Sequence, residues 1–383
     1  MTVFDQAPTR AQPAWRDTLR RAAALFGPPI AAFLLARVSL VLVAASVGER
    51  ATKAKAWSRW DSAHYLSIAE RGYEFFSCAR LPGYDPTHHC GNTGWLPGLP
   101  WLIRAATALH VDPVRAGVWI AGACALVTLI VLWVGFLGPR LSSRGLLTLG
   151  LAAFFPGFVY EHALFPVSLC ALCQVSAIKA FEQRRFVLAG VAGACGAFSY
   201  SSGIFFAAVL GLPLLLTTRP SNLRRRVPEM FAAAGITALG FAAFLAVLQL
   251  EVGNWRAYFL VQQKYGFGIN APWKTLLPHL ESLSKVPSQQ TIFVAVLALA
   301  LLWAAARAPR ILLDGVLATF LLFYWLVPLM LGGQLSLYRA EAVLLPAVLL
   351  ARKLPTPVLA ALTAVAVLIG LRMGALFFRG ILV

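Results

Sequence analysis

Charged residues are scarce in this chain. Of its 383 residues, 13% are Asp, Glu, Lys or Arg, whereas 59% are hydrophobic. Soluble globular domains carry about 25% charged residues, so this composition excludes an ordinary soluble domain. Nucleotide-binding signatures are absent as well: the sequence contains no P-loop and no Gly-x-Gly-x-x-Gly turn between a strand and a helix. A nucleotide site built on either motif is therefore excluded.

Long hydrophobic runs are abundant instead. A helix needs about 20 apolar residues to cross the hydrocarbon core of a bilayer. The longest runs are Pro29–Val47, Arg115–Leu137, Val227–Leu250, Ile311–Leu331 and Thr356–Phe378. Shorter runs lie at Gly145–Tyr160, Ala163–Ala180, Phe186–Tyr200, Gly203–Leu216, Thr291–Ala306 and Ala342–Ala351. The sequence predicts an all-α polytopic membrane protein, a bundle of about eleven transmembrane helices.

The net charge of +18 follows a pattern typical of membrane proteins. If the N-terminus is cytoplasmic, alternate connections between the runs hold 17 of the 33 basic residues and only five acids. These basic residues are Arg10, Arg16, Arg20, Arg21, Arg140, Arg144, Lys179, Arg184, Arg185, Arg219, Arg224, Arg225, Arg226, Arg307, Arg310, Arg352 and Lys353. Basic residues collect on the cytoplasmic side of membrane proteins. The charge therefore sets orientation, and we expect no nucleic-acid partner.

This topology divides the chain into six parts. They are a cytoplasmic basic leader (1–28), the first transmembrane helix (29–47), a large extracytoplasmic loop (48–114), transmembrane helices (115–250), a second large extracytoplasmic loop (251–290) and C-terminal transmembrane helices (291–383). Pro29–Val47 is interpreted as a retained signal anchor. Residues 15–26 place apolar side chains on one helical face, typical of a helix on the inner leaflet or of an ordered cap before the first span. Trp95–His110 is short and proline-rich, so we expect a helix in the membrane interface.

Two of the six cysteines, Cys78 and Cys90, share the first large loop. Outside the cytoplasm such a pair can be oxidised, which would close a short polar segment. A zinc site that adds His88 and His89 is the alternative, although adjacent ligands suit a single tetrahedral metal poorly. Both interpretations stay open from the sequence. The other cysteines lie in apolar runs, where buried thiols are ordinary.

Five polar segments fall on the same predicted side of the membrane. They are Gly48–Gly94, Tyr160–His162, Ser199–Ser202, Glu251–Gln290 and Gln334–Glu341. Polar groups at membrane depth are costly and usually face an interior cavity. A single extracytoplasmic site would explain why all five share that side. Arg37, in the middle of the first run, also requires a partner or a wet cavity; it either lines a groove for lipid or extends to the interface.

The densest polar and aromatic cluster spans Trp57–Arg71. Asp61 lies there before a short helical pattern, with His64 at i+3 and Tyr65 at i+4 on its face. A carboxylate in such a place can take a proton from an attacking hydroxyl. The structural alternative is that Asp61 caps the helix while Trp57 and Trp60 form an interfacial belt.

These residues resemble a known family. Trp60-Asp61-Ser-Ala-His64-Tyr65-Leu-Ser-Ile-Ala-Glu-Arg-Gly72-Tyr73, followed by Trp95-Leu-Pro-Gly-Leu-Pro100, is similar to the first-loop signature of the GPI mannosyltransferase II (PIG-V) family. Three later segments resemble family segments more weakly: Tyr160-Glu161-His162, Gln263-Lys264-Tyr265 and Tyr338-Arg339-Ala-Glu341. In the first of them the acid sits one place early. In Ser199–Gly203 the family's arginine and proline are absent.

The resemblance implies a GT-C-type glycosyltransferase fold. The family uses a polyprenyl-phosphate sugar, most often mannose, and transfers it to a lipid or glycan acceptor outside the cytoplasm. Asp61 matches the family's catalytic acid and would act as general base in an inverting single displacement, with His64 as its catalytic neighbour. The residues expected to bind substrate are Trp60, Tyr65, Glu161, His162, Gln263, Lys264, Tyr265, Tyr338, Arg339 and Glu341.

Several alternatives stay open. Arg339, Lys264, His64 and Arg256 are candidates for the donor phosphate, with Arg339 preferred because its charge is stranded between apolar segments. Pairing of Arg339 with Glu341 is the structural alternative. The transferred sugar is undetermined, and a flippase or transporter of a lipid-linked saccharide is a different class of function.

Partners and location follow from the same features. We expect a sugar donor on polyprenyl phosphate, membrane lipids and no certain cofactor. A divalent metal ion stays open, and no residues are assigned to it. The Ala-, Arg-, Leu- and Val-rich composition is typical of a bacterium with a GC-rich genome, so we expect the plasma membrane of such a cell.

Overall fold

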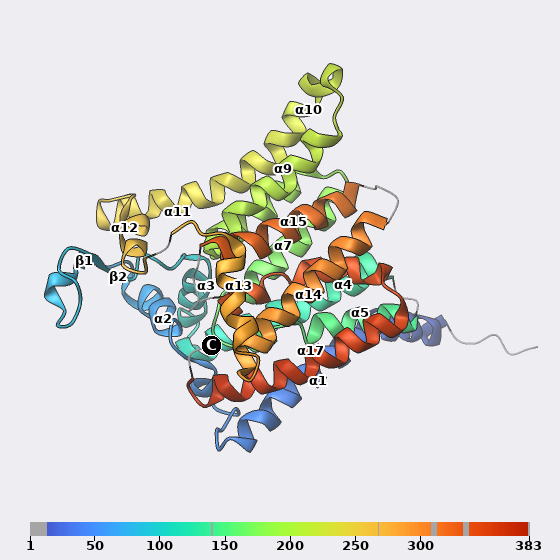
Figure 1. The fold of residues 1–383 in the computed structure, drawn as a ribbon, viewed down its shortest axis with the longest axis horizontal. Helices are drawn as coiled ribbons and strands as arrows, with labels where there is room; N and C mark the ends of the chain where they lie inside the picture. Colours follow the sequence, from blue (N-terminus) through green and yellow to red (C-terminus); the bar gives the residue numbers. More distant parts are fainter. Residues whose placement is uncertain (1–13, 139–140, 267, 308–311, 332–336, 382–383) are drawn as a thin grey trace, which may run out of the picture.

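The computed structural model describes residues 14–138, 141–266, 268–307, 312–331 and 337–381, most of them helical (Figure 1). Its α-helices are α1 (Ala14–Ser46), α2 (Ser62–Arg71), α3 (Gly98–Thr107), α4 (Pro113–Leu132), α5 (Ser143–Ala153), α6 (Phe158–His162), α7 (Val167–Glu182), α8 (Phe186–Ser199), α9 (Phe206–Thr217), α10 (Leu223–Met230), α11 (Ile236–Val252), α12 (Ala257–Gln263), α13 (Pro272–Glu281), α14 (Val286–Arg307), α15 (Leu312–Met330), α16 (Leu337–Ala342) and α17 (Thr356–Phe378). Arg10, Arg140, Arg310 and residues 334–336 of the sequence predictions lie outside the described residues.

Six helices among the described residues are long and apolar enough to cross a membrane. They are Arg21–Ser46, Pro113–Leu137, Arg226–Val252, Val286–Arg307, Leu312–Met330 and Thr356–Phe378. All five long runs predicted from the sequence are among them, and the sixth extends the shorter run Thr291–Ala306. The protein is therefore an all-α polytopic membrane protein. The total of eleven transmembrane helices stays a prediction.

Some shorter runs form elements too short to cross a bilayer alone. Ala342–Ala351 falls mainly in a 3₁₀ helix, Leu345–Lys353, which is buried from Leu345 to Ala351. At about 2.0 Å rise per residue this helix spans roughly 18 Å, against a hydrocarbon core of about 30 Å. Its apolar composition reflects burial among other helices. Hydropathy alone cannot separate such a core helix from a short transmembrane one.

The first helix is longer than expected. α1 runs without a break from Ala14 to Ser46 and continues through Pro28 and Pro29. A helix of this length measures about 50 Å at 1.5 Å per residue, which exceeds the hydrocarbon core. The Nε1 of Trp133 donates to the Ala24 carbonyl at 2.9 Å and so ties α1 to the end of α4. Leader and first span are thus one continuous element.

The large loops gather at one end of the bundle, which we call the loop end: α2, α3, α12 and the β1–β2 hairpin, at the left of Figure 1. α10 and the first residues of α1 lie at the opposite end. Direct contacts join the loops, because Thr93 Oγ1 donates to the Ala257 carbonyl at 3.1 Å and the Tyr73 amide donates to Glu251 Oε2 at 2.9 Å. These contacts join the first large loop to the start of the second, and the side of the membrane that the loops face stays a prediction.

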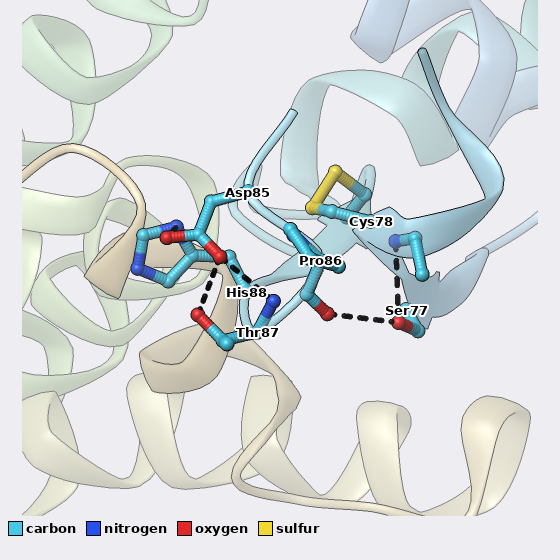
Figure 2. The surroundings of a disulfide bond; sticks show 8 residues. Ser77, Cys78, Asp85, Pro86, Thr87 and His88 are labelled. Atoms are coloured by element: carbon cyan, nitrogen blue, oxygen red, sulfur yellow. Dashed lines mark hydrogen bonds and ion pairs between the residues drawn. A yellow bond between two sulfur atoms is a disulfide. The ribbon is translucent and has the colours of Figure 1, made fainter. Parts of the chain in front are cut away.

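A disulfide closes the small hairpin in the first loop. β1 (Phe75–Ser77) pairs antiparallel with β2 (His89–Gly91), and Cys78 is bonded to Cys90. Figure 2 shows the bond beside a turn in which Thr87 donates to Asp85 and Ser77 donates to the Pro86 carbonyl. The disulfide interpretation is therefore confirmed, and the zinc alternative is wrong because both thiols are consumed.

Small residues allow the helices of the bundle to approach closely. A Cβ added at Gly240 of α11 would lie 2.1 Å from the Ala194 carbonyl oxygen of α8, and one at Gly190 would lie 2.0 Å from the Ala232 oxygen. Thr237 Oγ1 reaches the Gly190 carbonyl at 3.4 Å. Backbone approach through small residues is a common packing mode in membranes, where hydrophobicity alone gives helices little reason to associate.

We predict that Gly240→Ala destabilises the protein by about 2 kcal/mol, because the new methyl group must push α11 away from a backbone oxygen. The measurement is the thermal unfolding midpoint in detergent. Gly122→Ala is the matched control, since the nearest atom to a Cβ at Gly122 in α4 is 3.8 Å away. Equal midpoints for both variants would show that the α8–α11 contact does not limit stability.

Candidate functional site

An ion pair between Asp61 and Arg339 joins two distant parts of the chain at the loop end. The guanidinium NH1 of Arg339 donates to Asp61 Oδ2 across 278 positions of sequence. Arg339 belongs to the short helix α16, whereas Asp61 immediately precedes α2. The Asp61 side chain is 24% exposed and that of Arg339 is 13% exposed. The pair is thus shielded while Asp61 still reaches the surface.

Asp61 does not cap the helix that it precedes. Its φ of −61° and ψ of −15° are helical, and its side chain makes no capping hydrogen bond. Trp60, just before it, has a φ of +44°, which is uncommon for a residue with a side chain. Such strain persists only where the surroundings impose it, and it often marks functional sites. The capping interpretation is therefore wrong, and the carboxylate is directed to Arg339.

The two tryptophans before Asp61 anchor the loop in the protein and do not form an interfacial belt. Trp57 is 1% exposed, and its Nε1 donates to the Ala51 carbonyl at 2.8 Å. It packs edge-on against Phe378, as Trp60 does against Phe377. Both partners end α17, so this helix supports the segment that carries Asp61.

Backbone contacts with one further segment fix the start of α2. Leu164 accepts from Ser62 Oγ at 2.9 Å through its carbonyl, and its amide donates to the Trp57 carbonyl at 3.0 Å. Ser62 Oγ in turn accepts from the Arg59 amide at 3.1 Å. Asp61 lies between these anchors. Its backbone position is consequently set by the segment after α6.

Aromatic rings surround the other half of the pair. The guanidinium of Arg339 lies 5.4 Å from the centroid of the Phe165 ring. It also interacts electrostatically with Tyr200 and Tyr65. Glu341, which the sequence offered as an alternative partner of Arg339, instead accepts a hydrogen bond from Gln290 Nε2 at 2.7 Å and is 4% exposed. The alternative in which Arg339 pairs with Glu341 is therefore wrong.

His64 lies flat on Trp95. Their ring centroids are 3.6 Å apart, with an interplanar angle of 16°. Burial lowers the pKa of His64, Asp61 opposes this effect, and the positive charge of Lys264 adds to it. His64 is therefore neutral at pH 7. The structure places His64 near the Asp61 carboxylate, with its ring stacked on that of Trp95.

The second large loop brings one cation near these stacked rings. The Lys264 ammonium lies 5.0 Å from the ring centroid of Tyr265, and burial lowers its pKa. Burial also raises the pKa of Tyr265 to about 12. Gln263, Arg256 and Trp255 are exposed, so the sequence prediction that Gln263 and Arg256 bind substrate gains no support from their positions. Of these residues, Lys264 is the candidate that the structure brings to the site.

Two other predicted residues lie deeper in the bundle. Glu161 is 4% exposed, and neither of its carboxylate oxygens has a hydrogen-bond partner among the described residues. The His162 carbonyl accepts from Arg37 at 2.9 Å, and its ring packs against Phe33. No described contact joins either residue to Asp61. Tyr65 is buried against Phe165, whereas Tyr338 lies near the ring of His279, 6.2 Å away between centroids.

Sequence reasoning gave no role to Phe165, Tyr200 or Glu251. The first two lie near Arg339. Tyr200 belongs to the polar segment Ser199–Ser202, whereas Phe165 lies inside the apolar run Ala163–Ala180 and carried no signal. Glu251 holds the end of α2: its Oε2 accepts from the Tyr73 amide and would lie 2.9 Å from a Cβ at Gly72. Gly72 also has a φ of +84°. A glycine is therefore required there, for conformation and for space.

Comparison with known proteins does not identify a family for this chain. No protein-family model matches the chain, and no curated protein matches it. The similarity of the first-loop motif to the PIG-V family stays an expectation. Function has to be inferred from the site itself.

The arrangement offers two chemical capacities. A partly exposed carboxylate can accept a proton from a hydroxyl. A planar, permanently charged guanidinium can hold a phosphate through paired hydrogen bonds. Within the described ranges no three His, Cys, Asp or Glu side chains are grouped as metal ligands. The structure thus places a partly exposed carboxylate beside a guanidinium.

We predict a pH-dependent difference between the wild type and His64→Phe. The lowered pKa of His64 means that the folded protein binds its proton less tightly than the unfolded chain does. This stabilisation is complete above pH 6.5 and is lost as the pH falls through the folded pKa. The wild type should therefore lose stability relative to the variant between pH 7.5 and 5. Unfolding midpoints in detergent measure this, and parallel curves would refute the burial of His64.

Proposed function

We propose that the protein is a glycosyltransferase that moves a sugar, mannose in the first instance, from a polyprenyl-phosphate donor to a hydroxyl of a lipid or glycan acceptor. The observation that carries this proposal is the ion pair of Asp61 and Arg339, partly open to solvent at the loop end. A base and a phosphate-binding cation are the two groups that such a reaction requires. The resemblance of the Asp61 segment to the PIG-V signature supports the same chemistry.

The mechanism begins with an exchange of partners. The donor phosphate binds the Arg339 guanidinium and replaces the Asp61 carboxylate there. Asp61 then accepts the proton of the acceptor hydroxyl while the oxygen of that hydroxyl attacks the anomeric carbon of the donor sugar. The bond from that carbon to the phosphate oxygen breaks, and its electron pair leaves with polyprenyl phosphate. A single displacement inverts the configuration, so a β-linked donor gives an α-linked product.

The surrounding residues suit these steps. The stacked rings of His64 and Trp95 present a flat surface for a sugar beside the carboxylate. Lys264 supplies a second positive charge. Phe165 and Tyr65 shield the ion pair from water, which strengthens charge interactions in the site. Trp60, which carries the left-handed backbone, directs Asp61 toward Arg339.

The distribution of basic residues supports an orientation for this site. The loop end would face outward from the plasma membrane of a bacterium, and the N-terminus would be cytoplasmic, according to the positive-inside pattern. A donor made on a polyprenyl carrier reaches that side within the bilayer. Its isoprenoid chain would stay among the apolar helices while the sugar enters at Asp61.

We predict that Asp61→Asn lowers the rate of sugar transfer by a factor of about 10² to 10⁴, because the amide cannot take the proton. Membranes that contain equal amounts of each variant receive radiolabelled polyprenyl-phosphate mannose and native lipid extract. Glu70→Gln is the matched control, since its carboxylate lies on α2 but is exposed. Its activity should equal that of the wild type.

Transfer by Asp61→Asn at the wild-type rate would refute the role of Asp61 as base. Activity of the wild type with a donor that carries a different sugar, but not with the mannose donor, would keep the mechanism and change the substrate. If the wild type moved the labelled lipid across vesicle membranes without forming product, the protein would be a flippase and the proposal would fail.

A further inference from the structure

A second polar feature lies at the loop end and includes none of the residues assigned above to sugar transfer. It is a groove of about 1010 Å³ between the end of α1, residues 51–58 and the start of α4. Neither Asp61 nor Arg339 lines it. Four cations do so: Arg37, Lys53, Lys55 and Arg115.

The positive charge of this groove is not balanced by acids. No ion pair among the described residues includes any of its four cations. The one acid in its lining, Asp112, accepts from the Arg115 amide at 2.9 Å and so caps α4. Its charge is directed to the helix N-terminus, which is itself positive. An anion is therefore the ligand that the groove favours.

Arg37 reaches the groove from within the membrane span. It lies nine residues before the end of α1 at Ser46, about 14 Å along the helix at 1.5 Å per residue. Its guanidinium lies 3.6 Å from the centroid of the Trp57 ring and donates to the His162 carbonyl at 2.9 Å. Both partners are uncharged. A full positive charge is thus held at a fixed place below the mouth of the groove.

Exposed apolar side chains border the groove. Trp119 lines it and is 64% exposed, one turn along α4 from Arg115. Val38 and Leu42, close to Arg37 on α1, are exposed as well. Large apolar side chains that are exposed on a membrane helix face acyl chains. Positive charge above a lipid-facing apolar surface matches the layout of a phospholipid, with its phosphate above its chains.

We propose that this groove binds the phosphate headgroup of an anionic lipid, with Lys53, Lys55 and Arg115 at its mouth and Arg37 below. The site is distinct from sugar transfer and does not depend on the function proposed above. Two lipids share the required chemistry: a bulk anionic phospholipid and a polyprenyl phosphate. Binding measurements with each lipid distinguish them, because the phospholipid carries acyl chains and the polyprenyl phosphate carries an isoprenoid chain.

The test measures lipid binding to the purified full chain in neutral detergent by native mass spectrometry. The probes are phosphatidylglycerol, polyprenyl phosphate and zwitterionic phosphatidylcholine. Lys53→Gln and Arg115→Gln change exposed residues of the groove, and Lys285→Gln, exposed but outside it, is the control. Each groove variant should weaken phosphatidylglycerol binding about fivefold. The control should leave it unchanged, and phosphatidylcholine should bind weakly to all.

If the groove variants weaken polyprenyl phosphate alone, the site still binds a lipid phosphate and its ligand is the isoprenoid one. Equal affinity for phosphatidylglycerol and phosphatidylcholine would overturn the proposal. So would equal losses for the groove variants and Lys285→Gln, because the effect would then come from net charge. Unfolding midpoints of the three variants verify that each is folded.

Discussion

The loop end of this protein depends on the ion pair between Asp61 and Arg339. Each group is largely shielded from water, and removal of one partner from a buried pair costs about 3–5 kcal/mol because the other charge is left without compensation. The two residues lie 278 positions apart. The pair therefore joins the segment before α2 to the helix α16, and the residue next to Asp61, Trp60, has a left-handed backbone.

A pair that is needed for the fold can also serve as a site, because an incoming anion can take the place of the carboxylate. A phosphate offers Arg339 the same kind of hydrogen bonds as Asp61 does, so the guanidinium stays compensated while Asp61 is released. The aromatic rings of Phe165 and Tyr65 lie beside the pair. The basic groove beside Arg37 differs in one respect: its cations have no carboxylate partner among the described residues, so it is ready for an anion from the start.

The sequence predicted the elements of this molecule better than the contacts between them. Long apolar runs identified the membrane helices because burial in hydrocarbon requires a continuous apolar stretch. The Trp57–Arg71 segment drew attention to Asp61 because polar groups are rare in such a chain, and the role of Asp61 stays a prediction. Two structural alternatives, a cap at Asp61 and pairing of Arg339 with Glu341, were wrong, because the fold brings Asp61 to Arg339 and Glu341 to Gln290, partners that lie far apart in sequence. The 3₁₀ helix Leu345–Lys353 was not foreseen, because burial in protein and burial in lipid select the same apolar residues. Glu251, which holds the backbone after Gly72, carried no signal at all.

The most direct test of the exchange of partners is the affinity of polyprenyl phosphate, without a sugar, for three purified proteins in detergent. Asp61→Asn removes the competitor for Arg339, so this variant should bind the lipid at least as tightly as the wild type. Arg339→Gln removes the anion-binding group and should bind it at least about tenfold more weakly, the effect of one charge-assisted hydrogen bond. Equal losses of affinity in both variants would contradict the account, because the lipid phosphate would then not compete with Asp61 for Arg339.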